Sequence, residues 1–428
     1  MKQPASTWLT DGRLHFALGI EDTFVPQSRE GQRALDEYDL TEHYQCYQAD
    51  FHLAAQAGAE LLRWGVPWYR VNPAPGRWDW SWTDKAIEAQ LAAGLRPIVD
   101  LIHYGTPKWL ENQFANPDYP KHVEEYARQF SRRYGDAVTD YTPVNEPVIH
   151  ALFCGEYAYW PPYLTGPDGF AAIAANIARG FVRSQLAIAE ELGDAAVFVH
   201  VEAAMSFIED APSKHAVEIA RLRHQVHLVE DLVTGRVDSA HPLRRQLATV
   251  IDDRELRWFD HHAVQPDVMG VNYYPRHSTE LFEAGVTHSG GFADPRPTID
   301  RGVDGLRDAL EDFAGRYEVP VMVTETCVTG SVQERLQWLD QSVNLVENLR
   351  AAGTNVIGYT WWPLFDMYEW TWRHSTNPRA NHRLTMGLYD LEETSTGLAR
   401  IPNPVADRYR THALRARAQT SHAHAALH

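Results

Sequence analysis

The hydrophobic and polar positions of the chain alternate between two patterns. Short apolar runs are each followed by polar loop residues and then by a longer segment in which apolar residues recur at helical spacing. Eight runs have the length and composition of buried strands: Phe16–Ile20, Leu61–Val66, Arg96–Ile102, Val138–Val144, Ala196–Val201, Val268–Asn272, Val319–Thr324 and Val356–Trp361. The helical stretches between them include Asp84–Ala93, Lys121–Tyr134, Gly169–Leu192, Ser213–Thr234 and Val332–Ala352.

Strands that alternate with helices in this way predict an α/β fold, either a single parallel (β/α)8 TIM barrel or a doubly wound open sheet. An open sheet usually carries a glycine-rich phosphate-binding turn after its first strand. The first strand here runs instead into Gly19-Ile20-Glu21-Asp22-Thr23, which is no such turn. The barrel is therefore predicted. Gly94 and Gly353 each follow a helical stretch shortly before a strand, where a left-handed C-cap is expected.

We expect one domain over residues 1–410, because barrels grow by loop insertion and exceed the usual domain length as one unit. From about Thr411 the sequence is short of large apolar residues. It predicts a frayed helix and a flexible tail over residues 411–428. The closing histidines His422, His424 and His428 are interpreted as part of a solvated tail rather than as a metal site.

The composition of the chain excludes several classes of binding partner. A formal net charge of −18 argues against nucleic acid and anionic membranes, since binding phosphate requires clustered Lys and Arg. No run of 18 apolar residues could span a bilayer, and the start MKQPASTWLTDGRLHF lacks the apolar segment of a secretory signal. Three sparse cysteines suit a reducing compartment, so a cytoplasmic protein is expected. The 14 tryptophans are more than a core of this size needs, and such rings serve as platforms for sugars.

Two glutamates stand where predicted strands stop. Tyr141-Thr142-Pro143-Val144-Asn145-Glu146-Pro147 ends the fourth strand, and Val321-Met322-Val323-Thr324-Glu325-Thr326 ends the seventh. Catalytic side chains of parallel barrels come from the C-terminal ends of the strands. Glycosidic bond cleavage needs one carboxyl group that protonates the leaving oxygen and one that meets the anomeric carbon. A single strand-end glutamate is often a structural ion-pair partner, but two on strands four and seven favour this chemistry.

These segments resemble the family 1 glycoside hydrolases, the β-glucosidase family, over roughly residues 14–400. Thr142-Pro143-Val144-Asn145-Glu146-Pro147 is similar to the family's T-x-N-E-P acid/base segment, and Val323-Thr324-Glu325 is similar to its I/V-T-E nucleophile segment. Trp362-Pro363-Leu364-Phe365-Asp366-Met367-Tyr368-Glu369-Trp370 is similar to W-S-L-L-D-N-F-E-W. The three motifs occur in the family's order at barrel-strand spacing.

The resemblance implies a retaining β-glycosidase, exo-acting and glucosidase- or galactosidase-like. Glu146 would protonate the leaving group and later deprotonate water, while Glu325 would attack the anomeric carbon from a carboxyl group about 5–5.5 Å away. Arg63, in Arg63-Trp64-Gly65-Val66-Pro67-Trp68, matches the arginine of R-F-S-I-S-W beside the nucleophile, where its charge would lower the pKa of Glu325. Tyr274 matches the G-x-N-Y-Y tyrosine that contacts the nucleophile.

The resemblance also implies a sugar-binding set. Asn145 would hydrogen-bond the sugar 2-hydroxyl, and His103 matches the histidine of the family's Y-H-W-D. Trp362 matches the stacking floor of the pocket, and Glu369 with Trp370 matches the pair that holds the far hydroxyls. The expected substrate-binding residues are His103, Asn272, Trp362, Glu369 and Trp370.

The chain departs from the family at three loops. The family's S-Y-Q-x-E after strand one is replaced by a segment, Glu21 to Gln27, in which no residue takes over the sugar-gripping glutamine. The W-D after the histidine is Tyr104-Gly105, and the E-N-G after the nucleophile is Thr326-Cys327. We therefore expect the reaction type to be retained and the usual glucose preference not to be.

Alternative functions on the same scaffold stay open. They are a transglycosidase, an endo-acting hydrolase, a glycosidase for a modified sugar, and a non-catalytic sugar-binding barrel. The expected partner is a small-molecule glycoside, and the sequence does not indicate the oligomeric state. No cofactor or metal is expected, since this chemistry needs none and His261-His262 has no helix-spaced partner of the H-E-x-x-H kind.

Overall fold

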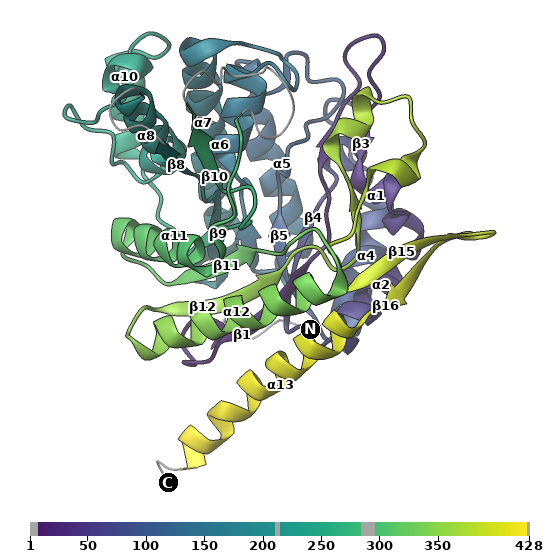
Figure 1. The fold of residues 1–428 in the computed structure, drawn as a ribbon. Coiled ribbons are helices and arrows are strands. Elements are labelled where there is room, and N and C mark those ends of the chain that lie inside the picture. The colour runs from purple at the N-terminus through teal and green to yellow at the C-terminus, as the bar shows by residue number, and fades with distance from the viewer. Residues whose placement is uncertain (1–6, 210–214, 284–295, 426–428) are drawn as a thin grey trace.

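A closed barrel of eight parallel strands forms the centre of the molecule (Figure 1). The computed structural model describes residues 7–209, 215–283 and 296–425, and the side chains of residues 8–418 within them. The strands adjoin in the order β1, β12, β11, β9, β7, β6, β5 and β4, which confirms the barrel prediction. Their bounds are β1 His15–Gly19, β4 Leu61–Gly65, β5 Arg96–Asp100, β6 Asp140–Thr142, β7 Val197–Ala203, β9 Val268–Asn272, β11 Val321–Glu325 and β12 Val356–Trp361.

A long helix follows each barrel strand. All eight predicted strands and the five predicted helices are present, with ends shifted by a few residues; position 213, the predicted start of one helix, lies outside the described residues. Gly94 and Gly353 have the expected positive φ, 79° and 104°. The helices are α2 His43–Gln56, α4 Ser81–Ala92, α5 Tyr119–Tyr134, α7 Gly166–Leu192, α8 Ala216–Val233, α11 Gly302–Tyr317, α12 Val332–Ala351 and α13 Pro404–Ala425.

The N-terminal end of the barrel is closed by side chains. Trp8 packs there against the interior cluster, and its indole Nε1 donates to Asp140 Oδ2 at 3.0 Å. The cluster fills the barrel because side chains at alternate strand positions point inward. A ligand can therefore approach only from the opposite, C-terminal end of the strands. The cluster comprises Trp8, Ala17, Leu61, Ile98, Val197, Val199, Val201, Val268, Met322 and Ile357.

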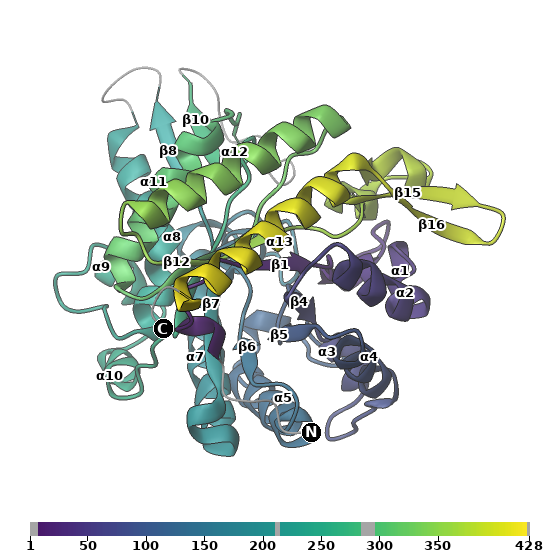
Figure 2. The same ribbon diagram turned by 90° about the horizontal axis from the view of Figure 1, so that it is seen from below.

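Helix α13 runs beneath the barrel, where Figure 2 shows it crossing under β1. The Tyr409 hydroxyl donates to the Ala17 carbonyl at 2.7 Å, and Ala413 and Ala416 are buried. The predicted flexible tail is therefore wrong for residues 411–418, because small alanines at helical spacing allow close packing on the barrel. The side chains of His422 and His424, and all of His428, lie outside the described residues.

Short paired strands are added to the barrel and were not predicted. β8 (Ser206–Glu209) pairs with β10 (Thr279–Phe282) after the C-terminal ends of β7 and β9. β15 (Tyr389–Thr394) and β16 (Gly397–Pro402) form a hairpin that projects from one side (Figure 2). Within the described ranges, none of the helices combines the length and apolarity that crossing a bilayer requires.

Gly19, the last residue of β1, leaves room for the Trp362 ring to pack directly against the strand backbone. A Cβ on Gly19 would lie 1.7 Å from Trp362 Cε3, whereas a Cβ on Gly315, inside α11, would meet no atom within 4 Å. We predict that Gly19→Ala lowers the free energy of unfolding by about 1–3 kcal/mol through overpacking. The control Gly315→Ala should raise it by about 1 kcal/mol through helix propensity. Thermal melting of the two variants tests the pair, and equal melting temperatures would contradict the packing argument.

Candidate active site

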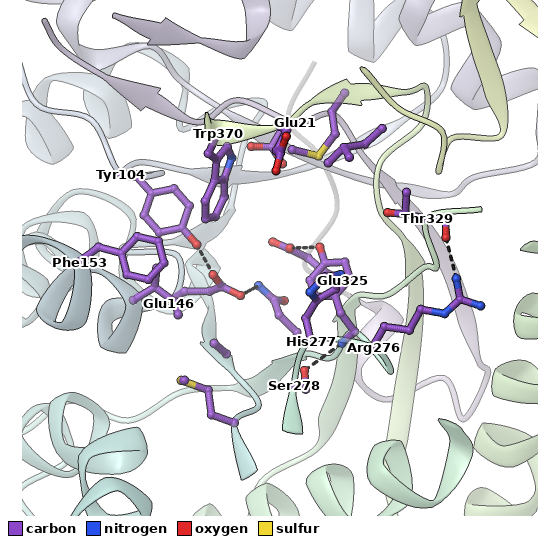
Figure 3. Close-up of a pocket in the computed structure, with 18 of the residues that line it drawn as sticks. Glu21, Tyr104, Glu146, Phe153, Arg276, His277, Ser278, Glu325, Thr329 and Trp370 are labelled. Atoms are coloured by element: carbon purple, nitrogen blue, oxygen red, sulfur yellow. Dashed lines mark hydrogen bonds between the residues drawn. The ribbon is translucent and has the colours of Figure 1, made fainter. Parts of the chain in front are cut away.

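One cavity of about 450 Å³ opens at the C-terminal end of the barrel. Both strand-end glutamates, Glu146 and Glu325, line it and point into the same space (Figure 3). Each is almost completely buried, at 7% and 4% exposure. The fold therefore brings together two acids that stand far apart in the sequence.

Glu325 is the last residue of β11 and is held from two sides. Arg63 is the third residue of β4, and its Nη1 donates to Oε1 at 2.8 Å. The Tyr274 hydroxyl donates to Oε2 at 2.6 Å. The backbone of Glu325 pairs with Asn272 at the end of β9. Of the three residues predicted to support catalysis, Arg63 and Tyr274 thus contact Glu325 directly. The third, Asn145, contacts Arg63.

Glu146 lies in the turn between β6 and the short helix α6 (Pro147–His150). Its backbone is left-handed, with φ of 44°, which is uncommon for a residue other than glycine. Asn272 Nδ2 donates to Oε1 at 2.9 Å, and the Tyr104 hydroxyl donates to Oε2. Asn272 therefore links the two strand ends, since it bonds the Glu146 side chain and pairs with the Glu325 backbone.

The Arg63 guanidinium contacts Glu325 and is fully buried. Besides Glu325, it donates through Nη2 to Asp100 Oδ2 at 2.6 Å and to Asn145 Oδ1 at 2.9 Å. Two buried carboxylates therefore share one permanent cation, which satisfies the general requirement that a buried charge be paired.

Burial raises the pKa of both catalytic candidates. At Glu146 the hydrogen bonds from Tyr104 and Asn272 oppose that rise in pKa. At Glu325 burial raises the pKa and the charge of Glu146 adds to it, while Arg63 lowers it. Because a permanent cation contacts Glu325 and only neutral donors contact Glu146, a single negative charge on the pair belongs on Glu325.

His103 lines the cavity between carboxylates. Its Nδ1 lies 3.0 Å from Asp22 Oδ1 and 3.3 Å from Asp100 Oδ2. Burial lowers the pKa of His103, but the two aspartates raise it well above the ordinary value. The aspartates place a ring proton on Nδ1, while Nε2 lies 3.3 Å from the amide nitrogen of Asn145.

Three predicted residues are placed differently from expectation. Trp362 is 1% exposed and stacks beneath His103, at 5.5 Å between ring centroids, so it supports the cavity wall instead of forming the floor. Asn145 is fully buried behind the cavity, its amide already bonded by Arg63. Glu369 lines the rim with a half-exposed side chain, near His382.

Except for Trp370, the aromatic wall on the Glu146 side was not predicted from the sequence. Phe153, Trp160 and Trp370 contact one another, with ring centroids 4.8 to 6.1 Å apart, and Tyr104 packs edge-on against both tryptophans. Phe153 belongs to a π-helix, Ala151–Glu156, a form often found at functional sites. The high tryptophan count was the available signal. The opposite side of the cavity is polar and carries Arg276, His277, Ser278 and Thr329 (Figure 3).

Glu21 also faces the cavity (Figure 3). It is 3% exposed and accepts hydrogen bonds from Trp362 Nε1 at 2.8 Å and from the Thr23 backbone amide at 3.1 Å. Both donors are neutral. The altered loop after β1 thus contributes a buried carboxylate to the pocket, which its sequence alone did not assign.

The chain is similar to known glycoside hydrolases in sequence. The family model described as Glycosyl hydrolase family 1 matches residues 3–377. The chain belongs to glycosyl hydrolase family 1. Similar proteins include thermostable β-glucosidase B of Thermobispora bispora, 26% identical over 86% of this chain and 81% of that protein. A β-galactosidase of Pyrococcus woesei is 22% identical over 82% of this chain and 81% of its own. This family 1 member is therefore an O-glycosyl hydrolase, and the family supports a retaining β-glycosidase.

Solved structures agree on the fold. The family 1 β-glucosidase of Thermotoga maritima superposes with a TM-score of 0.76 at 18% identity, covering 96% of this chain and 98% of that one. The same enzyme in complex with deoxynojirimycin gives a TM-score of 0.76 at 19% identity over 97% and 99%. At such identities the likeness establishes the (β/α)8 barrel of this family 1 hydrolase.

Arg63 gives a direct test of the charge arrangement. We predict that Arg63→Met lowers the free energy of unfolding by about 3–5 kcal/mol, since it strands buried carboxylates without a cation. The pKa of Glu325 should rise, because the cation that stabilises its carboxylate is lost. Arg63→Lys keeps the charge but not the forked geometry. Its free energy of unfolding and its Glu325 pKa should therefore lie between those of wild type and Arg63→Met. Thermal melting and 13C NMR titration of Glu325 provide the measurements, and an unchanged Glu325 pKa in Arg63→Met would refute the assignment.

Proposed function

We propose that the protein is a retaining β-glycosidase in which Glu325 is the nucleophile and Glu146 the general acid/base. The observation that carries the proposal is the shared cavity: both carboxyl groups face it, and a buried guanidinium contacts only one of them. Retention needs two carboxyl groups on opposite sides of one sugar, about 5–5.5 Å apart. Asn272, which joins their strand ends, supports that spacing.

In the first step Glu146 protonates the glycosidic oxygen as Glu325 attacks the anomeric carbon, so the aglycone leaves and a glycosyl-enzyme ester forms. In the second step Glu146 removes a proton from water, the water oxygen bonds to the anomeric carbon, and Glu325 is released as a carboxylate. Ester formation removes the charge of Glu325, which lowers the pKa of Glu146 and suits it to act as a base. Arg63 and Tyr274 stabilise the carboxylate before attack and after release.

The shape of the cavity favours small glycosides cleaved from one end. The barrel beneath it is filled and closed, so a sugar can enter only from the rim. Trp370 supports a sugar-binding role, because its ring lines the cavity and can stack on the apolar face of a sugar. The related Thermotoga maritima β-glucosidase binds deoxynojirimycin and glucoimidazole. The aromatic wall beside Glu146 suits an apolar face of the leaving group.

Glu21 favours a second candidate, a glycosidase for a modified sugar. A carboxylate accepts hydrogen bonds and attracts positive charge, whereas an amide both donates and accepts. Glu21 is buried and held by neutral donors, so its charge is weakly screened at the sugar-facing surface. Such a pocket suits a glycone that presents only donors or an amino group, and it disfavours uronic acids.

The roles of the two glutamates predict different products with azide. With an aryl β-glycoside of good leaving group, Glu146→Gln should accumulate the glycosyl-enzyme and lose about 10²–10⁴-fold in turnover. Added azide should restore turnover and yield the β-glycosyl azide, because azide needs no base. Glu325→Gln should yield the α-glycosyl azide, by direct attack on the face that the nucleophile normally uses. Product anomer by NMR is the measurement.

A labelling experiment identifies the nucleophile independently of turnover. A 2-deoxy-2-fluoro glycosyl fluoride should label wild type at Glu325, as seen by peptide mass analysis, and should not label Glu325→Gln. Labelling at another residue, or wild-type turnover by Glu325→Gln, would rule out the proposed nucleophile.

The charge of Glu21 predicts a change in substrate selectivity. Matched aryl β-glycosides of glucose, 6-amino-6-deoxyglucose and glucuronic acid give three values of kcat/KM. We expect wild type to prefer the cationic to the anionic sugar, and Glu21→Gln to reduce that ratio about tenfold, roughly the effect of one removed charge at partly screened distance. Glu369→Gln is the matched control and should change the ratio less, because the Glu369 side chain is half-exposed and screened. An unchanged ratio in Glu21→Gln would remove the modified-sugar candidate.

A further inference from the structure

The direction of the hydrogen bonds around Glu146 is set by Arg63. A guanidinium has only donors, so the atom of Asn145 that faces Arg63 Nη2 at 2.9 Å must be its carbonyl oxygen Oδ1. Asn272 Nδ2 donates to the same oxygen at 3.2 Å. The Asn145 amide therefore cannot be turned around. Its NH2 group points the other way, with its nitrogen 3.3 Å from His103 Nε2 and 3.4 Å from the Tyr104 hydroxyl oxygen, and one of its two hydrogens is donated to Tyr104.

The Tyr104 oxygen accepts this hydrogen bond, and the hydroxyl group donates a second one. Because its oxygen accepts from Asn145, the hydroxyl hydrogen is directed to Glu146 Oε2, the other polar neighbour of the phenol. The chain of donors runs one way, from Arg63 through Asn145 and Tyr104 to Glu146. On the other carboxyl oxygen Asn272 also acts as a donor, at 2.9 Å. Both oxygens of Glu146 thus face donors, a surrounding complementary to a carboxylate rather than to an acid.

The position of the phenol is fixed by the fold and not by Glu146 alone. Tyr104 has φ of 70°, in the left-handed region, and its side chain is 3% exposed. Its ring contacts His150, Trp160 and Trp370, with centroids 4.9, 5.1 and 5.5 Å away. A strained backbone held by surrounding packing is characteristic of functional positions. Figure 3 shows the hydroxyl directed at Glu146 from the aromatic side of the cavity.

We propose that Tyr104 is a positioning residue of the acid/base: its hydroxyl donates to Glu146 in one direction and favours the carboxylate form of that residue. The inference rests on the proposed function of Glu146. A phenol here serves the second half of the reaction, in which Glu146 must be a carboxylate aimed at water. During the first half, Glu146 carries a proton and Tyr104 holds its orientation while the leaving group collects that proton.

The matched experiment removes, for each of the two glutamates, the tyrosine hydroxyl that donates to its carboxyl group. Tyr104→Phe deletes a donor to Glu146, and Tyr274→Phe deletes a donor to Glu325. The basic limb of kcat/KM follows loss of the proton from the acid, so Tyr104→Phe should move it to higher pH, by about one unit for a hydrogen bond to a charged group. Tyr274→Phe should instead move the acidic limb to higher pH, since the nucleophile must be ionised. A purely structural role of Tyr104 would lower kcat/KM at every pH without moving either limb.

A second measurement does not depend on turnover. The carboxyl carbon of Glu146, labelled with 13C and assigned by its absence in Glu146→Gln, should titrate at higher pH in Tyr104→Phe than in wild type. The same signal should also titrate in a protein that hydrolyses no glycoside, so an inactive enzyme with a shifted Glu146 would count against the proposed function alone. An active enzyme in which Glu146 and the basic limb stay within 0.2 units, a margin of about 0.3 kcal/mol, would overturn the role of Tyr104. Circular dichroism confirms that both phenylalanine variants are folded.

Discussion

The buried cation Arg63 is the interaction on which the reaction centre depends. Its two terminal nitrogens bond Glu325, Asp100 and Asn145, which come from different strands of the barrel. A guanidinium suits this position because it is always charged and offers donors in fixed directions. It assigns the negative charge of the pair to Glu325 and fixes the orientation of Asn145, and through Asn145 it orients the groups around Glu146. One residue on β4 thus makes two chemically identical glutamates different.

The pocket divides into a reaction centre tied to the barrel and a sugar-binding end built by loops. Glu325 ends β11, Arg63 lies in the middle of β4 and Tyr274 stands two residues beyond the end of β9, so the closed barrel limits their movement. Glu21, by contrast, lies in the loop after β1, and Glu369 lies at the rim. In the proposed function, the reacting groups are therefore held by the barrel, whereas sugar contacts come from loops that can vary. Substrate choice can change without disturbing the ion pair below it.

Most of the fold could be predicted from the sequence, because barrel strands are short buried runs and the helices between them have strong periodicity. Glu146 and Glu325 could be placed because each follows such a run directly. Packing between distant loops could not be predicted. Trp362 was expected at the pocket surface, but its place beneath His103 depends on the bare backbone of Gly19 and on an acceptor from Glu21. The packing of helix α13 on the barrel was missed for a related reason, since its alanines pack by fitting closely and not by being hydrophobic in bulk.

The altered loop after β1 and the Tyr104-Gly105 pair, which look independent in the sequence, pack against each other in the structure. Asp22 bonds His103 and occupies the space where a Cβ on Gly65 would lie 1.3 Å from its Oδ2, so the residue at 65 must be glycine, where the family has serine. Likewise a Cβ on Gly105 would lie 2.6 Å from the Phe24 ring, and Phe24 belongs to the same altered loop. With Gly105 accommodating Phe24, Tyr104 stands in the left-handed turn that directs its hydroxyl to Glu146. The loop that carries Glu21 therefore also packs against the turn that places the Tyr104 hydroxyl beside Glu146, so the proposed sugar contact and the proposed positioning residue are structurally linked.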